Sequence, residues 1–219
     1  MLRVVKVTSP MSIGTWIVSA YAPAAFVAAG SELTGRLPRI GALATGAAAL
    51  AGPAVASYTS VLVADTAVPA WHEAHRELPF VFVGSATCAA AGLGLLGAST
   101  ADSGPARRAA MLGAVVETAA SHLMRDRLGI VRQTYESGSA GQLLRAAEKL
   151  TIGGAVVGAL LGRRSRVAAG AAGLALLAGS AGTRFGIFRA GIASAEDPRY
   201  TVEPQRARLD AREAAAAAR

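Results

Sequence analysis

The residues best suited to chemistry collect in one stretch, 54–80, between two apolar segments. It contains Tyr58, Asp65, Trp71, His72 and His75. A phenol donates a hydrogen bond, and carboxylate and imidazole groups take up and release protons. On a helix Tyr58 and Asp65, seven residues apart, share one face about 10 Å apart along the axis. The pattern suits a hydrogen bond from Tyr58 to a carbonyl ligand, with Asp65 as a proton route to water. It also suits an interfacial tyrosine beside a helix-ending aspartate.

A second candidate is Glu117, a carboxylate in the middle of an apolar segment that carries His122 near its end. A charged side chain at the centre of a membrane span costs about 2.5–3.5 kcal/mol on insertion scales, so we expect Glu117 to face other helices or water. One interpretation is a proton relay of Glu117 and His122, or a carboxylate that contacts a quinone headgroup. The other is a structural hydrogen bond, either to Ser121 one turn away or to another helix.

The sequence gives little support for a resident metal or redox cofactor. His72 and His75 are spaced to ligate a metal, but spacing specifies no third ligand, and a solvated pair at the headgroup layer is the alternative. Cys88 is the single cysteine and lies in an apolar segment, which argues against an internal disulfide and a cysteine-ligated iron-sulfur cluster. Only His122 lies within a predicted span, which argues against an intrinsic haem.

The distribution of charge predicts the elements that position these residues. Only 16% of the 219 residues are charged, and charge is absent between Lys6 and Glu32, between Arg39 and Asp65, and between Glu77 and Asp102. Each gap exceeds the roughly 20 residues that cross about 30 Å of hydrocarbon as a helix. The gaps also lack the polar face, at 3.6-residue spacing, of a soluble helix. We therefore predict an all-α fold, a polytopic membrane helix bundle.

We predict about six transmembrane helices. Three fill the charge gaps, at about 11–30, 40–65 and 78–101. The fourth covers about 109–124, the fifth ends at Gly162, and the sixth covers about 167–183. Residues 1–195 then form the membrane-embedded bundle, and residues 196–219 form a polar C-terminal tail, frayed or disordered over its last nine residues.

The cationic residues predict orientation. With six spans, 15 of the 22 Lys and Arg residues lie on one side of the membrane. Because cytoplasmic loops carry the excess, we expect both termini and the 71–76 loop to face the cytoplasm of a multi-pass plasma-membrane protein. The net charge of +8 then reflects basic residues in the loops and the tail, which set the orientation and contact lipid headgroups. We therefore expect no nucleic-acid partner.

Gly154, Gly158 and Gly162 form a row on one face of the fifth span. Small residues at this spacing let two helices approach closely. The row therefore predicts packing, either inside the subunit or against a partner.

Several short runs resemble the NrfD/PsrC family, the polytopic membrane subunits of polysulfide, nitrite and formate-type oxidoreductase complexes. The runs are Met-Leu-Arg-Val-Val-Lys-Val-Thr-Ser-Pro-Met-Ser-Ile-Gly-Thr-Trp at 1–16, Tyr-Thr-Ser at 58–60, Ala-Val-Pro-Ala-Trp-His at 67–72, Glu-Leu-Pro at 77–79, Phe-Arg-Ala-Gly at 188–191 and Ser-Ala-Glu-Asp-Pro at 194–198. The similarity covers the chain to about Leu209. Ser60 stands where the family usually has glycine.

The resemblance implies a membrane anchor that binds a quinone, menaquinone or ubiquinone, near the membrane surface. Such an anchor exchanges electrons with a ferredoxin-like iron-sulfur subunit, which serves a molybdopterin catalytic subunit. By position, Tyr58 is the expected quinone contact, with Asp65, Trp71 and His72 beside it, and Glu117 and His122 deeper as a proton relay. The chain itself is then either non-catalytic or quinone-reactive.

Family members carry further spans before the Met-Leu-Arg run. We therefore expect either a start inside a longer reading frame or a shortened member of the family. A transporter or proton-translocating bundle built on Glu117, and a pure anchor with no working quinone site, are the alternatives.

Overall fold

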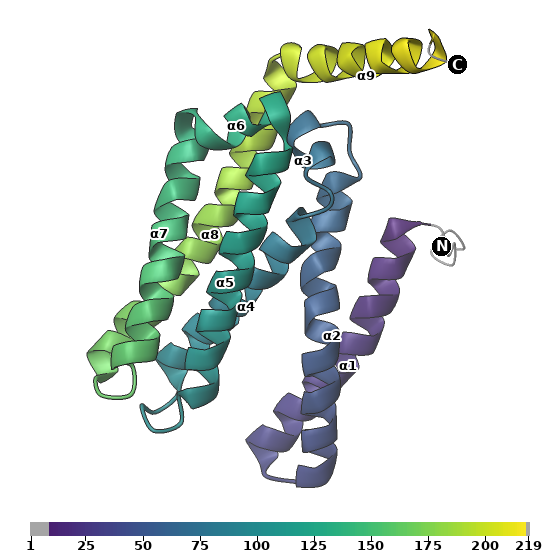
Figure 1. Cartoon of the computed structure of the whole chain (residues 1–219). Coiled ribbons are helices and arrows are strands. Elements are labelled where there is room, and N and C mark those ends of the chain that lie inside the picture. Colours follow the sequence, from purple (N-terminus) through teal and green to yellow (C-terminus); the bar gives the residue numbers. More distant parts are fainter. Residues whose placement is uncertain (1–8, 218–219) are drawn as a thin grey trace. The chain divides into compact units, whose positions relative to one another are not determined.

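A computed structural model describes residues 9–217, and every regular element in that range is helical (Figure 1). The chain divides into two compact units, Met1–Val63 and Ala64–Arg219. The first half of the run at 1–16 that carries part of the family resemblance, residues 1–8 with Arg3 and Lys6, lies outside the described residues.

The first unit contains two long helices, α1 (Pro10–Thr34) and α2 (Pro38–Ala64). Ala64, the last residue of α2, already belongs to the second unit. Gly35, with a φ of 64°, ends α1 in the left-handed conformation that favours glycine. Ser31 Oγ donates to the carbonyl of Arg36 at 2.8 Å and so fastens the turn. Near the other ends of the helices, the Tyr58 ring lies so close to Gly14 that a Cβ there would overlap it.

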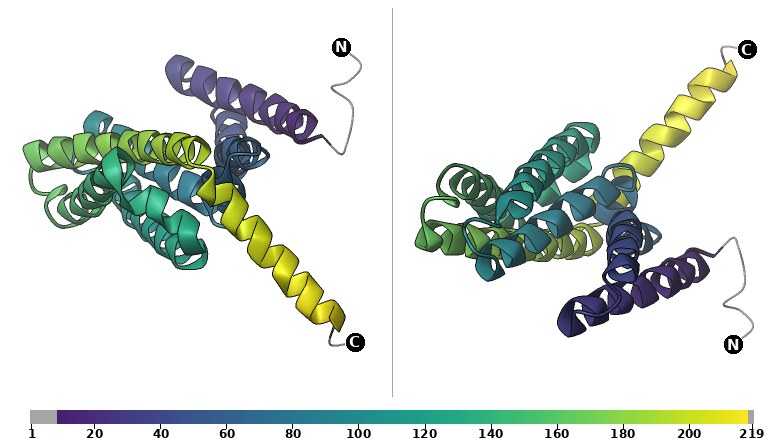
Figure 2. Two further views of the ribbon diagram at one scale, coloured as in Figure 1. Left: turned by 90° about the horizontal axis from the view of Figure 1, so that it is seen from above. Right: turned by 90° about the horizontal axis from the view of Figure 1, so that it is seen from below.

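The second unit is a bundle of four long helices with short elements at one end. The long helices are α4 (Leu78–Gly97), α5 (Gly104–Arg127), α7 (Gly138–Leu161) and α8 (Arg166–Glu196). The short elements are α3 (Pro69–Glu73), η2 (Gly129–Val131) and α6 (Arg132–Glu136). Helix α9 (Arg199–Ala217) follows and points away from the bundle (Figure 2). The residues from 211 to 217, expected to be frayed or disordered, therefore continue a helix.

Glycine brings the backbones of the bundle together. A Cβ on Gly92 of α4 would lie 2.7 Å from the carbonyl oxygen of Gly173 on α8, and the reverse distance is 2.6 Å. In the predicted glycine row, Gly154 and Gly158 both face Ala172 of α8. Of the two predicted kinds of packing, inside the subunit or against a partner, these two glycines therefore show the first.

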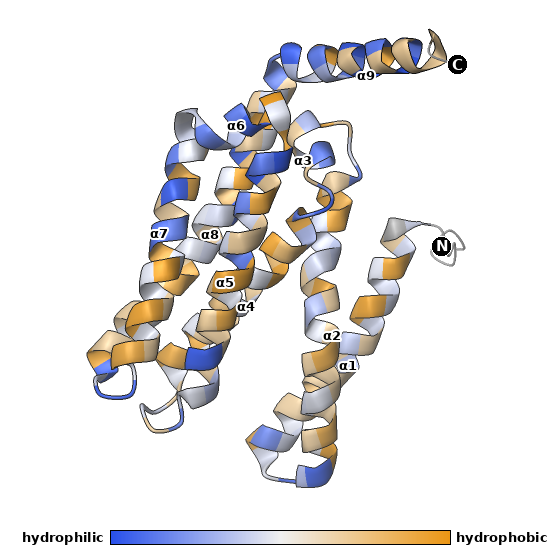
Figure 3. Ribbon diagram, viewed as in Figure 1, coloured by the Kyte–Doolittle hydropathy of each residue, from blue (hydrophilic) through white to orange (hydrophobic). Residues whose placement is uncertain are grey.

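Four helices, α1, α2, α4 and α8, are long and apolar enough to cross a membrane. Their bounds agree closely with the predicted first three spans, and α8 runs well past the predicted end at Thr183. Helices α5 and α7 have the length but carry more polar residues. Figure 3 shows hydrophobic residues along the middle of the bundle and hydrophilic ones toward its ends.

Helix α3 is fastened to α8 by a tryptophan. The Trp71 indole N–H donates to the carbonyl of Ile187 at 2.9 Å, and the ring stacks on Phe188 with centroids 6.1 Å apart. Gly191 leaves the space that the indole fills, because a Cβ there would overlap the ring. Ser194 Oγ accepts from the Ala70 N–H at 3.1 Å. Segments 67–72 and 188–198, which carry part of the family resemblance, therefore pack on each other.

We predict that Gly191→Ala destabilises the protein by about 1–3 kcal/mol, because its methyl group displaces a packed indole. Thermal unfolding in detergent, followed by Trp71 fluorescence in a Trp16→Phe background, measures the loss. Gly153→Ala, a matched change on α7 with no neighbour within 4 Å, should be neutral or slightly stabilising. Equal stability of the two variants would contradict the proposed role of Gly191.

Candidate functional site

The most polar interior of the second unit surrounds Glu117 on α5. Its side chain is only 5% exposed, and Oε1 accepts a hydrogen bond from Thr183 Oγ1 of α8 at 2.6 Å. Oε2 is buried and has no hydrogen-bond partner among residues 9–217, and the same holds for Thr151 Oγ1 on α7. Of the two structural bonds considered for Glu117, the one to another helix is the one present.

A small cavity adjoins both unpartnered oxygens. Its volume is about 30 Å³, which exceeds the roughly 10–15 Å³ that one water requires. It is too small for a drug-sized ligand, whose pockets measure about 300–1,000 Å³. The lining residues include Glu117, Ser121, Arg125, Glu148, Thr151 and Thr183.

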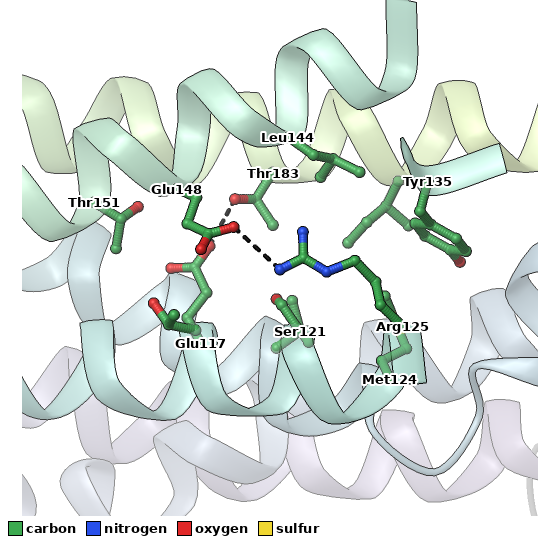
Figure 4. Close-up of a pocket in the computed structure, with 12 residues that line it drawn as sticks. Glu117, Ser121, Met124, Arg125, Tyr135, Leu144, Glu148, Thr151 and Thr183 are labelled. Atoms are coloured by element: carbon green, nitrogen blue, oxygen red, sulfur yellow. Dashed lines mark hydrogen bonds and ion pairs between the residues drawn. The ribbon is translucent and has the colours of Figure 1, made fainter. Parts of the chain in front are cut away.

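The outer end of this cavity is an ion-pair cluster. His122 Nε2 donates to Glu148 Oε1 at 2.9 Å, and Arg125 donates to Glu148 Oε2 at 3.2 Å. Figure 4 shows Glu117, Ser121 and Arg125 on one helix, facing the same space as Glu148 and Thr183. Polar groups therefore continue from a buried carboxyl to a histidine whose side chain is 57% exposed. We call this set, Glu117, Ser121, Arg125, Glu148 and His122, the polar track.

A second polar region is the turn 65–77, which leads through α3. His72 Nδ1 lies 3.2 Å from the carbonyl oxygen of Ala64. A carbonyl only accepts, so Nδ1 carries the proton and Nε2 of neutral His72 is an acceptor. His72 lines a groove of about 260 Å³, together with Thr66, Ala67, Pro69, Glu73, Tyr200, Thr201, Gln205 and Arg208. We call this the His72 groove.

Helix α9 closes one side of the His72 groove. Arg208 of α9 pairs with Glu73 of α3 at 3.2 Å. Tyr135 of α6 supports α3 from the bundle side, where its hydroxyl donates to the Ala70 carbonyl at 2.9 Å. Burial raises the pKa of the Tyr135 phenol above its ordinary value, so the phenol stays a donor.

The predicted site residues fall into separate places. His72 lines the His72 groove, and Asp65 is exposed just after α2. The Trp71 side chain extends from α3 and packs against α8. Tyr58 belongs to the first unit, is half-buried, and its hydroxyl has no hydrogen bond within residues 9–217. Glu117 and His122 stand at the two ends of the polar track.

Sequence reasoning missed Glu148, which belongs to the polar track, and Thr151 and Thr183, which line the same cavity. The signal available was weak: Glu148 and Thr151 lie three residues apart, one helical turn, where α7 becomes apolar. Among the described residues there is no group of three or more His, Cys, Asp or Glu side chains placed to hold a metal ion.

Comparison of the chain with models of protein families, with curated proteins and with solved structures finds no match.

The pair that fixes the start of α4 gives a pH prediction. Arg127 donates to both oxygens of Glu77, at 2.7 and 2.6 Å, and this bonding lowers the pKa of Glu77 below its ordinary 4.5. A lowered pKa stabilises the fold above pH 4.5, and this contribution is lost as pH falls through the lowered value. Glu77→Gln should cost about 0.5–1 kcal/mol at neutral pH and flatten the acid limb of the stability curve.

Thermal unfolding in detergent between about pH 3 and about pH 7 measures this effect. Glu136→Gln, which removes the more exposed i,i+4 pair with Arg132, is the control and should leave the acid limb steep. An unchanged acid limb in Glu77→Gln would show that the pair does not set it.

Proposed function

We propose that the chain is the quinone-linked membrane anchor of an oxidoreductase complex, whose partners are a ferredoxin-like iron-sulfur subunit and a molybdopterin catalytic subunit. The resemblance to the NrfD/PsrC family supplies the class. The observation that carries the proposal is the His72 groove, where an imidazole has one nitrogen fixed by a backbone carbonyl and the other without a hydrogen bond among residues 9–217.

The packing of the second unit supports six spans. Helices α5 and α7 have 24 residues each, about 36 Å of helix. Helix α5 packs along α4, and α7 packs along α8, and both α4 and α8 are apolar enough to cross a membrane (Figure 1). If α4 and α8 cross, α5 and α7 cross with them and turn their polar groups inward, as bundles in lipid require. With α1 and α2 this makes six.

The His72 groove fits the headgroup of a quinone and leaves a long apolar tail to the lipid. Its volume of about 260 Å³ lies just below the usual range for ligand pockets, about 300–1,000 Å³. The cavity at Glu117 admits water only. Grooves of larger volume lie elsewhere on the second unit, so the choice rests on the family resemblance, which points to His72 and its neighbours. We therefore assign the quinone to the boundary turn and the proton groups to the interior.

A bound quinone supplies two-electron, two-proton redox chemistry. His72 Nε2 accepts a hydrogen bond from a hydroxyl of the reduced headgroup and is the first base available to it. Trp71 holds α3 in place, since its own N–H is bonded to Ile187. The exposed Asp65 passes protons to water.

The test is binding of a fluorescent, redox-inactive quinol analogue to the full chain in nanodiscs. Loss of one neutral hydrogen bond costs about 0.5–1.5 kcal/mol, about two- to tenfold in affinity, so His72→Phe should bind about two- to tenfold more weakly. His75→Phe is the matched control, because His75 is exposed and does not line the groove. Equal affinity of the two variants, or no binding by the wild type, would contradict the proposed quinone site. The chain would then be an anchor without a quinone site.

A second candidate, a proton-translocating bundle without quinone, is favoured by the polar track. A buried carboxyl with one unpartnered oxygen, beside a water-sized cavity and an exposed histidine, is an arrangement suited to moving protons.

Proton uptake by liposomes containing the chain alone tests this candidate, with an interior pH dye and an imposed potential. Glu117→Gln keeps the shape and the bond from Thr183 but removes the exchangeable proton, so flux should fall to the empty-liposome rate. Glu136→Gln, outside the track, should conduct as the wild type does. Wild-type flux in Glu117→Gln would exclude a relay through this carboxyl.

A further inference from the structure

Four arginines gather at the end of the second unit that lies opposite α3 and α9 (Figure 1). They are Arg107 and Arg108, near the start of α5, and Arg163 and Arg164, between α7 and α8. Three of them, Arg107, Arg163 and Arg164, line a groove of about 590 Å³ with Leu160 and Leu161. We call this the arginine groove.

These four cations are unpaired. None forms an ion pair within residues 9–217, and Nε of Arg107 is buried without a hydrogen-bond partner there. At the opposite end Arg125, Arg127 and Arg208 each pair with a glutamate, whereas Arg189, Arg206 and Arg212 form no ion pair within residues 9–217. The arginine groove differs because three unpaired guanidinium groups line one groove together with two leucines. This arrangement suits an anion from outside the chain.

The neighbouring groups do not supply that anion. The nearby acid Asp102 accepts a hydrogen bond from Ser99 at 2.6 Å and forms no ion pair. Arg166 donates to the carbonyls of Leu95, Leu96 and Ala98, so it closes the end of α4 and adds its charge to the same region.

The wall of the arginine groove is apolar. Leu160 is 68% exposed and Leu161 is 48% exposed, directly before the arginines in sequence. The linkers 98–103 and 162–165 are short, so the guanidinium groups lie within about one turn of apolar helix. That is the depth at which phospholipid headgroups meet acyl chains.

We propose that the arginine groove binds an anionic phospholipid. Arg107, Arg163 and Arg164 contact the phosphate oxygens, for which the planar guanidinium is suited. An acyl chain lies against Leu160 and Leu161. A free phosphate shares the first contact but not the second, so the apolar wall selects the lipid. The proposal stands whether or not the chain binds a quinone.

The experiment titrates the full chain, in phosphatidylcholine nanodiscs, with a fluorescent phosphatidylglycerol. Each basic residue near an anionic surface is worth about fivefold in affinity. The triple variant R107Q/R163Q/R164Q should therefore bind phosphatidylglycerol at least about tenfold more weakly, with phosphatidylcholine unchanged. R189Q/R206Q/R212Q is the control, because it removes the same charge from exposed positions outside the groove.

Equal losses in the two triple variants would overturn the proposal in favour of general charge attraction. Two further results together would show that the groove is a general anion site and does not select a lipid. Inorganic phosphate would compete at the same concentration as the lipid, and L160S/L161S would bind phosphatidylglycerol as the wild type does. If circular dichroism shows that the triple variant does not fold, the single variant R164Q is titrated in its place. Arg164 is exposed, its loss should cost about fivefold, and wild-type affinity in R164Q would overturn the proposal.

Discussion

The close approach of helix backbones at glycine is the constraint on which the second unit depends. Apolar surface here consists largely of alanine and glycine, which bury little area each, so stability requires that backbones nearly touch. Gly92 and Gly173 achieve this between α4 and α8, and Gly113 does so between α5 and α4, where a Cβ would lie 2.9 Å from the carbonyl oxygen of Gly84. At such spacing, short polar side chains reach across. Ser85 donates to Ser180 at 2.9 Å, and Thr183 donates to Glu117.

The same closeness separates two kinds of chemistry. Around Glu117 the helices leave room for water but for no larger ligand, whereas the boundary turn, which Trp71 and Tyr135 fasten to α8 and α6, carries the wider His72 groove. Protons and water need no more room than the cavity at Glu117 offers. The structure therefore separates Glu117 and His72, which the sequence had joined in one mechanism, into two places of different size.

The charge gaps predicted the first three long helices well, because long uncharged runs suit helices that can cross a membrane. Prolines, which the prediction did not use, mark several of the starts. Pro38, Pro69 and Pro79 each lie in the first turn of a helix. The sequence could not supply the partners of Glu117, since Thr183 is 66 residues away and only packing brings it near. Trp71 is similar: it is a predicted quinone contact, and its packing depends on the space at Gly191. Helix α8 extends past its predicted end at Thr183, because Arg184 stays in the helix and its Nη1 donates to Ser180 Oγ at 2.6 Å.

The two units obtain their stability differently. The most apolar windows of α4 and α8 are each 44% buried by the chain itself, but those of α1 and α2 are only 6% and 11% buried. Helices α1 and α2 are equally long and apolar, so in water this surface would be a large exposed patch. In a bilayer, lipid tails or another protein cover this apolar surface, so it is not exposed to water. The apolar surface of α1 and α2 is therefore suited to contact with lipid or with another protein.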